Sequence, residues 1–290
     1  MKKIVACIKL MRLHHSVKNA LVLLPAFFGG IIFTRSGFAG AVGAFFAFSL
    51  AASSIYVLND ICDARKDRLH PEKCKRPIAS GELGVSAAWI LFGGLLALGA
   101  AVSLLLGSLS GAVILLLYIV LNALYSFGGK SIPIADLCIL VSGFCLRVVY
   151  GSCITGTPMS KWLNLMVIAI SFFMALGKRR GELLGTAETT RNVLRFYTHG
   201  FLDKNMYVFL AMTDIFYALW ASDEKLATVC AKNPRFLIWT VPLVILITLR
   251  YSYKIESGGD GDPVEVLLSD RVLQGIVLLY ALAMLFIFYF

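Results

Sequence analysis

Long apolar runs separated by short polar segments recur from one end of the chain to the other. Most runs approach the 20 or so residues that an α-helix needs to cross a hydrocarbon core of about 30 Å. Segments of about ten residues with strictly alternating polarity, typical of a membrane β-barrel, are missing. The pattern predicts an all-α polytopic membrane protein, a bundle of nine transmembrane helices. The expected spans are Val17–Phe33, Gly37–Leu58, Val85–Leu106, Gly111–Tyr125, Ile132–Val149, Trp162–Leu176, Asn205–Trp220, Phe236–Leu249 and Val272–Phe290.

The polar segments between these runs are too short to form a separate soluble domain. We therefore expect residues 1–290 to form a single transmembrane domain. Residues 1–16 mix lysines with apolar residues and predict a short helix at the membrane interface. Two longer polar segments remain, an Asp-rich loop at 59–84 and a basic loop at 177–204.

The charges are few and unevenly distributed. Only 15% of the residues are charged, against about 25% in an ordinary soluble domain. The net charge of +10 does not indicate a nucleic-acid partner, because the basic residues lie in short segments beside the spans. If the N-terminus is cytoplasmic, most of the 27 Lys and Arg residues fall on the cytoplasmic side, as the positive-inside rule requires. Both loops then face the cytoplasm.

The Asp-rich stretch is the strongest chemical signal. Read as a helix, Asn59, Asp63 and Asp67 share one face, and Asp60 lies beside them. Like charges at this spacing repel unless a cation binds among them. Carboxylate and amide oxygens suit Mg²⁺, which usually takes one or two carboxylates together with substrate phosphates. A solvated, salt-bridged loop is the alternative.

Basic residues surround this stretch on the same predicted side of the membrane. Arg68, Lys75 and Arg76 follow it, Lys18 and Asn19 open the first span, and a run from Gly177 to Glu182 contains three cations. Acidic ligands close to cations predict a site for a metal-bound, phosphate-rich substrate.

A charged residue also lies inside an apolar span. Arg147 shares a helical face with Asp136 in the fifth span, and a charge within the membrane usually has a function. Two interpretations stay open. Arg147 lines the catalytic cavity, or it forms a structural ion pair, for which Asp214 in the seventh span is the natural partner.

The motifs together resemble a known family. The stretch Asn59-Asp60-x-x-Asp63-x-x-x-Asp67, followed by Arg76-Pro77, resembles the first Asp-rich motif of the UbiA superfamily of intramembrane prenyltransferases. More narrowly, the chain is similar to the decaprenyl-phosphate phosphoribosyltransferase branch. The further matching positions are Val17-Lys18-Asn19, Pro25, Tyr125-Ser126, Lys130, Asp136, Gly143-Phe144-x-Leu146-Arg147, Gly177-Lys178-Arg179-x-x-Glu182, Tyr197-Thr198, Phe201-Leu202, Gly261-Asp262-Pro263-Val264-Glu265 and Asp270-Arg271.

The resemblance implies a Mg²⁺-dependent enzyme that transfers 5-phosphoribose from phosphoribosyl pyrophosphate to a polyprenyl (decaprenyl) phosphate and releases pyrophosphate. It also implies a role in precursor synthesis for cell-wall arabinan, in a bacterial-type inner (plasma) membrane. The implied catalytic residues are Asp60, Asp63 and Asp67, which bind the metal with Asn59. The implied substrate-binding residues are Lys18, Asn19, Arg68, Lys75, Arg76, Tyr125, Lys130, Asp136, Arg147, Lys178, Arg179 and Glu182.

One departure separates this branch from typical prenyltransferases of the superfamily, which carry a second Asp-rich motif for a second Mg²⁺. Here the corresponding place is basic, and its only acids are Glu182 and Glu188. A prenyltransferase with a prenyl diphosphate donor and an aromatic acceptor is the alternative enzyme. A lipid or small-molecule transporter is the alternative of another class, although the chain shows no clear internal repeat. The sequence makes no prediction about an oligomer.

Overall fold

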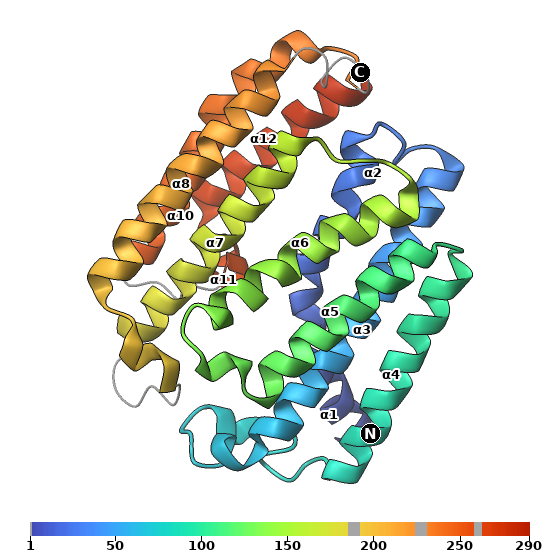
Figure 1. Cartoon of the computed structure of the whole chain (residues 1–290), viewed down its shortest axis with the longest axis vertical. Helices are drawn as coiled ribbons and strands as arrows, with labels where there is room; N and C mark the ends of the chain where they lie inside the picture. Colours follow the sequence, from blue (N-terminus) through green and yellow to red (C-terminus); the bar gives the residue numbers. More distant parts are fainter. Residues whose placement is uncertain (1, 185–191, 224–230, 258–262) are drawn as a thin grey trace. The chain divides into compact units, whose positions relative to one another are not determined.

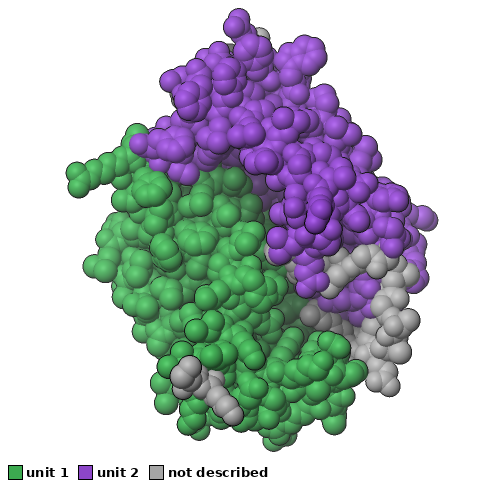
Figure 2. Space-filling model, turned by 180° about the vertical axis from the view of Figure 1, so that it is seen from behind, with its two compact units in different colours: residues 1–26, 34–157 green, residues 27–33, 158–290 purple. Residues whose placement is uncertain are grey.

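The structure, a computed structural model, describes residues 2–184, 192–223, 231–257 and 263–290. Every regular element in these ranges is a helix, which confirms the all-α prediction (Figure 1). The chain forms two compact units, shown in different colours in Figure 2. Unit 1 comprises residues 1–26 and 34–157, and unit 2 comprises residues 27–33 and 158–290. The expectation of a single functional domain stays a prediction.

Unit 1 contains the Asp-rich stretch and is built around its longest helix. Its elements are α1 (Lys2–Met11), η1 (Leu13–Leu23), the first part of α2 (Leu24–Phe28), α3 (Arg35–Asp67), η2 (Lys73–Lys75), α4 (Val85–Leu105), α5 (Leu109–Phe127), η3 (Gly129–Ser131) and α6 (Ala135–Thr155). Helix α3 contacts η1, α4, α5 and α6. In its most apolar window 61% of the residues are buried, against 22% in α4 and in α5. Helix α3 is therefore the centre of the unit.

Small residues allow the other helices to approach α3 closely. Ala44, Ala47 and Ala51 are fully buried on one side of α3. A Cβ atom placed on Gly99 of α4 would lie 3.1 Å from the backbone oxygen of Ala47 and 3.1 Å from the backbone nitrogen of Ala51. Between membrane helices, close van der Waals packing of this kind replaces the hydrophobic effect as the force for association.

The first expected span is not a regular α-helix. It consists of the 3₁₀-helical η1 followed by the short α2. A 3₁₀-helix rises about 2.0 Å per residue, so the 11 residues of η1 extend about 22 Å. The backbone of η1 lies directly against α6 at Gly151, where an added Cβ would overlap the carbonyl oxygen of Val22. Only glycine permits this contact.

Unit 2 consists of helices packed in sequential pairs. Its elements are α7 (Lys161–Leu184), η4 (Asn192–Phe196), α8 (His199–Ser222), η5 (Pro234–Thr240), α10 (Val241–Glu256), α11 (Pro263–Ser269) and α12 (Arg271–Tyr289). Helix α7 packs on α8, and α10 contacts both α8 and α12. Leu163, Tyr217, Trp220 and Phe288 contribute to its apolar core.

Seven helices in the described ranges are long and apolar enough to cross a membrane. They correspond to the second to sixth, eighth and ninth expected spans. The seventh corresponds to α8, whose 24 residues are less apolar, and the first to η1 and α2. Much of the apolar surface is exposed, including Ile90 at 78% and Leu105 at 86%. Such exposure suits contact with lipid, and the chain is a polytopic helical membrane protein.

The two polar segments begin differently from the prediction. The Asp-rich stretch is the end of α3, which continues without interruption to Asp67, so the loop begins at Arg68 and not at residue 59. In the basic segment, Gly177 to Leu184 form the end of α7, and α8 starts at His199. The Asp-rich stretch and the first part of the basic segment are therefore helix ends and not loops.

Candidate functional site

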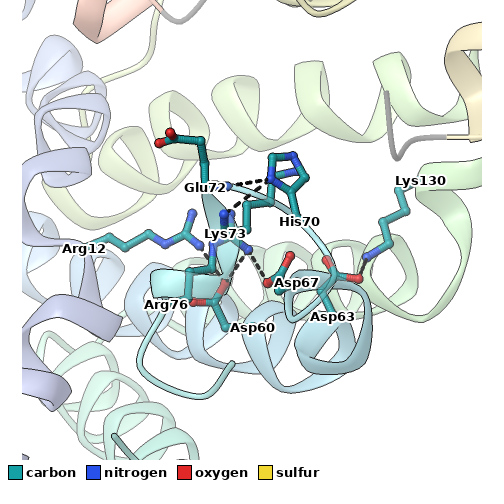
Figure 3. A network of polar contacts seen from close by, with 9 residues as sticks. All are labelled: Arg12, Asp60, Asp63, Asp67, His70, Glu72, Lys73, Arg76 and Lys130. Carbon is teal, nitrogen blue, oxygen red and sulfur yellow. Dashed lines mark hydrogen bonds and ion pairs between the residues drawn. The ribbon is translucent and has the colours of Figure 1, made fainter. Parts of the chain in front are cut away.

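Two aspartates at the end of α3 meet at one cationic nitrogen. Nη1 of Arg76 donates to Oδ2 of Asp67 at 2.7 Å and to Oδ1 of Asp60 at 3.2 Å (Figure 3). The two aspartates are seven residues apart, about two helical turns, and so lie on one side of α3. Both are nearly inaccessible to solvent. A buried carboxylate is costly unless a cation or hydrogen-bond donors neutralise it, and Arg76 does so for both.

The third aspartate has a separate partner. Nζ of Lys130, in η3, forms a short ion pair with Oδ1 of Asp63 (Figure 3). Helix α5 ends just before η3, where Gly128 closes its last turn, and this turn carries Lys130 toward the end of α3. Asn59 is half-buried on α3, one residue before Asp60. The predicted metal ligands thus lie together at the end of α3. Arg76 bridges Asp60 and Asp67, and Asp63 lies between them in the sequence.

The residues at this helix end fit a magnesium ion. The described ranges contain no ready-made cluster of three His, Cys, Asp or Glu side chains. However, one oxygen of Asp60 and one oxygen of Asp67 both contact the same positively charged nitrogen of Arg76, so the two carboxylates converge on a single cationic group. Mg²⁺ commonly binds one or two carboxylates and completes its shell with water and phosphate oxygens. Such an ion requires Arg76 to move away from this position.

The loop after α3 holds Arg76 in place. Nδ1 of His70 accepts hydrogen bonds from the backbone N–H groups of Glu72, at 3.1 Å, and Lys73, at 3.3 Å. The backbone N–H of Ser80 donates to the carbonyl oxygen of Arg76 at 2.8 Å. Arg68 and Lys75, both predicted to bind substrate, are exposed on the same loop. Two cations of this loop are therefore exposed to solvent, whereas Arg76 is held against Asp60 and Asp67.

The sequence-based prediction missed Arg12. Its Nη2 donates to Oδ1 of Asp60 at 2.6 Å, and its guanidinium lies 5.4 Å from the ring centre of Tyr56. Asp60 therefore forms ion pairs with two arginines, one that precedes it in the chain and one that follows it. The pattern marked Arg12 only as part of an interfacial helix. No spacing rule connects it with an aspartate 48 residues away.

Arg147 and Asn19 form a second, fully buried polar network. Nε of Arg147 donates to Oδ1 of Asn19 at 2.8 Å, and Nη1 donates to the carbonyl oxygen of Gly143 at 2.6 Å. Nδ2 of Asn19 donates to Ser49 of α3 at 3.0 Å. The guanidinium also lies 5.0 Å from the ring centre of Phe48. The network ties η1, α3 and α6 together, which gives both residues a structural role, and substrate binding by them stays a prediction.

The sequence suggested that Arg147 pairs with Asp214; Arg147 lies in unit 1 and Asp214 in unit 2, and the pairing stays a prediction. The partners of Arg147 lie within unit 1. Asp214 accepts a hydrogen bond from Thr248 of unit 2, at 3.2 Å. Within unit 1 the charge of Arg147 is met by an amide, a carbonyl and aromatic rings, which hold the side chain in place. Both sequence-based interpretations of Arg147, a lining of the catalytic cavity and an ion pair with Asp214, stay predictions.

The remaining predicted residues of unit 1 lie within η1 or at the ends of α5 and α6. Lys18 is half-buried in η1 beside Asn19. Tyr125 is half-buried in the last turn of α5, and Asp136 is completely buried in the first turn of α6. Their binding roles stay predictions.

The basic segment of unit 2 is largely paired with acids. Arg179, completely buried, donates to Glu182 at 2.7 Å. Arg180 pairs with Asp203 of α8 and also donates to the carbonyl oxygen of Ile255 at 3.3 Å. Lys178, which directly precedes these two arginines in α7, is half-buried. Glu182 is therefore a partner of Arg179, and Glu188 lies outside the described residues.

Asp270 organises the start of α12. Its Oδ1 accepts hydrogen bonds from the backbone N–H groups of Val272 and Leu273, and its Oδ2 pairs with Arg250 at 2.9 Å. Burial opposes the charge, but the Leu273 N–H, Arg250 and the Val272 N–H outweigh it and lower the pKa of Asp270 to about 2. Gly261 and Asp262 of the same predicted motif lie outside the described residues.

The fold and the site define an integral membrane protein whose central helix presents aspartates neutralised by arginine and lysine. The chain belongs to the UbiA prenyltransferase family, whose model matches residues 22–180. It is 37% identical to the decaprenyl-phosphate phosphoribosyltransferase of Corynebacterium glutamicum, over 93% of this chain and 83% of that protein. The protein of the same name from Mycolicibacterium smegmatis is 36% identical, over 92% of this chain and 87% of that one.

A solved structure supports the fold. A UbiA homologue from Archaeoglobus fulgidus, bound to GPP and Mg²⁺, matches with a TM-score of 0.72 and covers 97% of each chain. Only 20% of the aligned residues are identical, so this likeness concerns the fold alone.

The buried network of Arg147 predicts a loss of stability on its removal. Arg147→Ala leaves Oδ1 of Asn19 without its donor and opens a cavity among aromatic rings. We expect the free energy of unfolding to fall by about 2–4 kcal/mol, measured by denaturation of the detergent-solubilised protein. Arg35→Ala, at the exposed first residue of α3, is the control and should change stability by less than about 0.5 kcal/mol. Equal effects of the two substitutions would contradict the structural role.

Proposed function

We propose that this enzyme transfers phosphoribose from phosphoribosyl pyrophosphate to a polyprenyl phosphate, with decaprenyl phosphate as the reference acceptor. The main support is its similarity, over nearly the whole chain, to relatives named for this reaction. The cluster of aspartates and cations at the end of α3 supplies the chemistry that a diphosphate donor needs. A role in making precursors of cell-wall arabinan follows from the same relationship.

Asp60 and Asp67 are proposed to hold Mg²⁺, with Asn59 and Asp63 completing the polar surface around it. When bound, the ion supplies positive charge to the diphosphate that leaves. The rigid end of α3 keeps the carboxylates at fixed positions, and Arg76 and Lys130 lie close enough to bind phosphate oxygens. Catalysis is then mostly positioning and electrostatic stabilisation.

In the proposed reaction a lipid phosphate oxygen forms a bond to the anomeric carbon of ribose, and the bond from that carbon to pyrophosphate breaks. The acceptor needs no strong general base, because a phosphate monoester has a second pKa near about 6 and is largely dianionic at neutral pH. The residues of the chain therefore bind and orient two anionic substrates. No proton transfer is required of them.

The cations divide into two proposed groups. Arg68, Lys75 and Arg76, which lie on the loop after α3, are proposed to bind the phosphates that the ribose of the donor carries. Lys18, Lys130, Lys178 and Arg179 are proposed for the donor diphosphate or the lipid phosphate. The other proposed substrate-binding residues are Asn19, Tyr125, Asp136, Arg147 and Glu182. The lipid would reach the site from the bilayer, and the soluble donor from the loops.

The site is proposed to open to the cytoplasm in a plasma membrane. The support is the predominance of Lys and Arg residues on one predicted side of the membrane. Phosphoribosyl pyrophosphate is charged and water-soluble, so a site that opens to the cytoplasm gives it direct access.

A donor test decides between the two enzymatic functions. We would supply the purified protein and Mg²⁺ with labelled phosphoribosyl pyrophosphate and decaprenyl phosphate, and separately with a labelled prenyl diphosphate and an aromatic acid. We expect label in the lipid product only in the first mixture. Transfer only in the second would contradict the proposed function and favour a prenyltransferase. Absence of transfer in both mixtures would also contradict the proposed function and would favour the alternative of a transporter.

The metal role of α3 predicts large losses of activity. Asp60→Asn and Asp67→Asn preserve shape but remove a charge, and each should lower kcat/KM by about 100-fold or more. Glu82→Gln, at an exposed carboxylate on the loop after α3, is the control and should retain activity. Near-normal turnover of either Asp variant, at saturating Mg²⁺, would refute the assignment.

The basic segment of unit 2 predicts a contrast between two lysines of one helix. Lys178→Ala, near the end of α7 on the predicted cytoplasmic side, should raise KM by about tenfold. Lys161→Ala, at the opposite end of α7, should leave KM unchanged. Initial rates measured against each substrate provide the comparison. Equal effects would show that the predicted orientation of α7 is wrong.

A further inference from the structure

The N-terminal segment of unit 1 carries Arg12, whose side chain contacts Asp60. Ala6 and Leu10 of α1 are buried in an apolar cluster with Val57 and Ala64 of α3. Ser53 of α3 also donates a hydrogen bond to the carbonyl oxygen of Met11 at 3.1 Å. These contacts fix the end of α1 beside the part of α3 where the acids begin.

The backbone at Arg12 directs the side chain toward those acids. Arg12 has a φ of 49° and a ψ of 51°, a left-handed conformation that is uncommon for a residue with a side chain. Its N–H donates to the carbonyl oxygen of Lys9, and its own carbonyl accepts from the N–H of His15. This turn separates α1 from η1. The guanidinium reaches Asp60, whose side chain is only 3% exposed (Figure 3).

Each aspartate is neutralised by a cation from a different part of unit 1. Arg12 comes from the turn after α1, Arg76 from the loop after α3, and Lys130 from η3. The cations occupy carboxylate oxygens that a metal ion would use. Two arginines share Oδ1 of Asp60, at 2.6 and 3.2 Å. A dication placed there repels both guanidinium groups, so it cannot bind tightly while they stay.

A diphosphate changes this balance. Its oxygens offer the displaced cations new partners, and charge-assisted hydrogen bonds from arginine to phosphate are strong. The metal and the diphosphate would then promote the binding of each other, because each removes the charge imbalance that the other creates. Coupling of this kind is reciprocal between two ligands.

We propose that Arg12 acts, with Arg76 and Lys130, as an internal counter-cation to the aspartates. In the free protein these residues hold the aspartates, and they turn to the diphosphate when a metal–diphosphate complex binds. The site consequently discriminates against the bare metal ion and accepts the metal together with its substrate. This inference rests on the proposed function and adds Arg12 and the coupling to it.

The test measures metal binding directly. We would determine protein-bound Mn²⁺ by equilibrium dialysis of the full-length, detergent-solubilised protein, with and without inorganic pyrophosphate. The wild-type protein should bind Mn²⁺ at least about tenfold more tightly with pyrophosphate. Arg12→Gln should bind Mn²⁺ alone more tightly than the wild type, because a competing cation is gone. It should also lose most of the gain from pyrophosphate.

The matched controls separate this role from a purely structural one. Lys9→Gln removes an exposed cation from α1 and should behave as the wild type, and Arg12→Lys should restore the wild-type pattern. If Arg12→Gln does not fold, Lys130→Gln applies the same test at Asp63. A parallel loss of both affinities, or no change in either, overturns the counter-cation role alone. A wild-type protein that binds no Mn²⁺ in either condition overturns the proposed metal site as well.

Discussion

The ion pairs between the aspartates at the end of α3 and the cations around them are the interaction on which unit 1 depends. Asp60, Asp63 and Asp67 lie within eight residues of one helix, and two of them are nearly inaccessible to solvent. Uncompensated, such charges repel one another and resist burial. The segments that supply Arg12, Arg76 and Lys130 must therefore converge on α3. The same convergence collects the groups that are proposed to bind a metal-bound diphosphate.

A site made of paired charges is also a site that can exchange partners. A buried carboxylate bound to arginine is stable as it stands, and breaking the pair without replacement is costly. In the proposed function a metal ion and a diphosphate would provide that replacement together. The neutralisation that stabilises the free protein is thus compatible with substrate binding, provided that both new partners arrive. Arg76, which contacts two aspartates, is central to this exchange.

The buried arginine of α6, in contrast to the cations around the aspartates, is bound to neutral groups. Arg147 lies deep in unit 1, and its hydrogen bonds run to an amide, a backbone carbonyl and a tyrosine hydroxyl. Aromatic rings around it add cation–π attraction. Asn19 links this group to α3, so the network holds η1 and α6 against the helix that carries the aspartates. A charge within a span can serve the architecture of a site without being part of the reaction.

The sequence by itself determined the all-α membrane architecture, because runs of about 20 apolar residues leave few other structures open in a bilayer. The spacing of Asn59, Asp63 and Asp67 also predicted a shared helix face with Asp60 beside it, since helical periodicity is local. Only the tertiary structure decided which cation meets which aspartate, because Arg12 and Lys130 are 48 and 67 residues from their partners. The helical extension of α3 to Asp67, the irregular first span and the partners of Arg147 likewise depended on packing between distant segments, which no local pattern encodes.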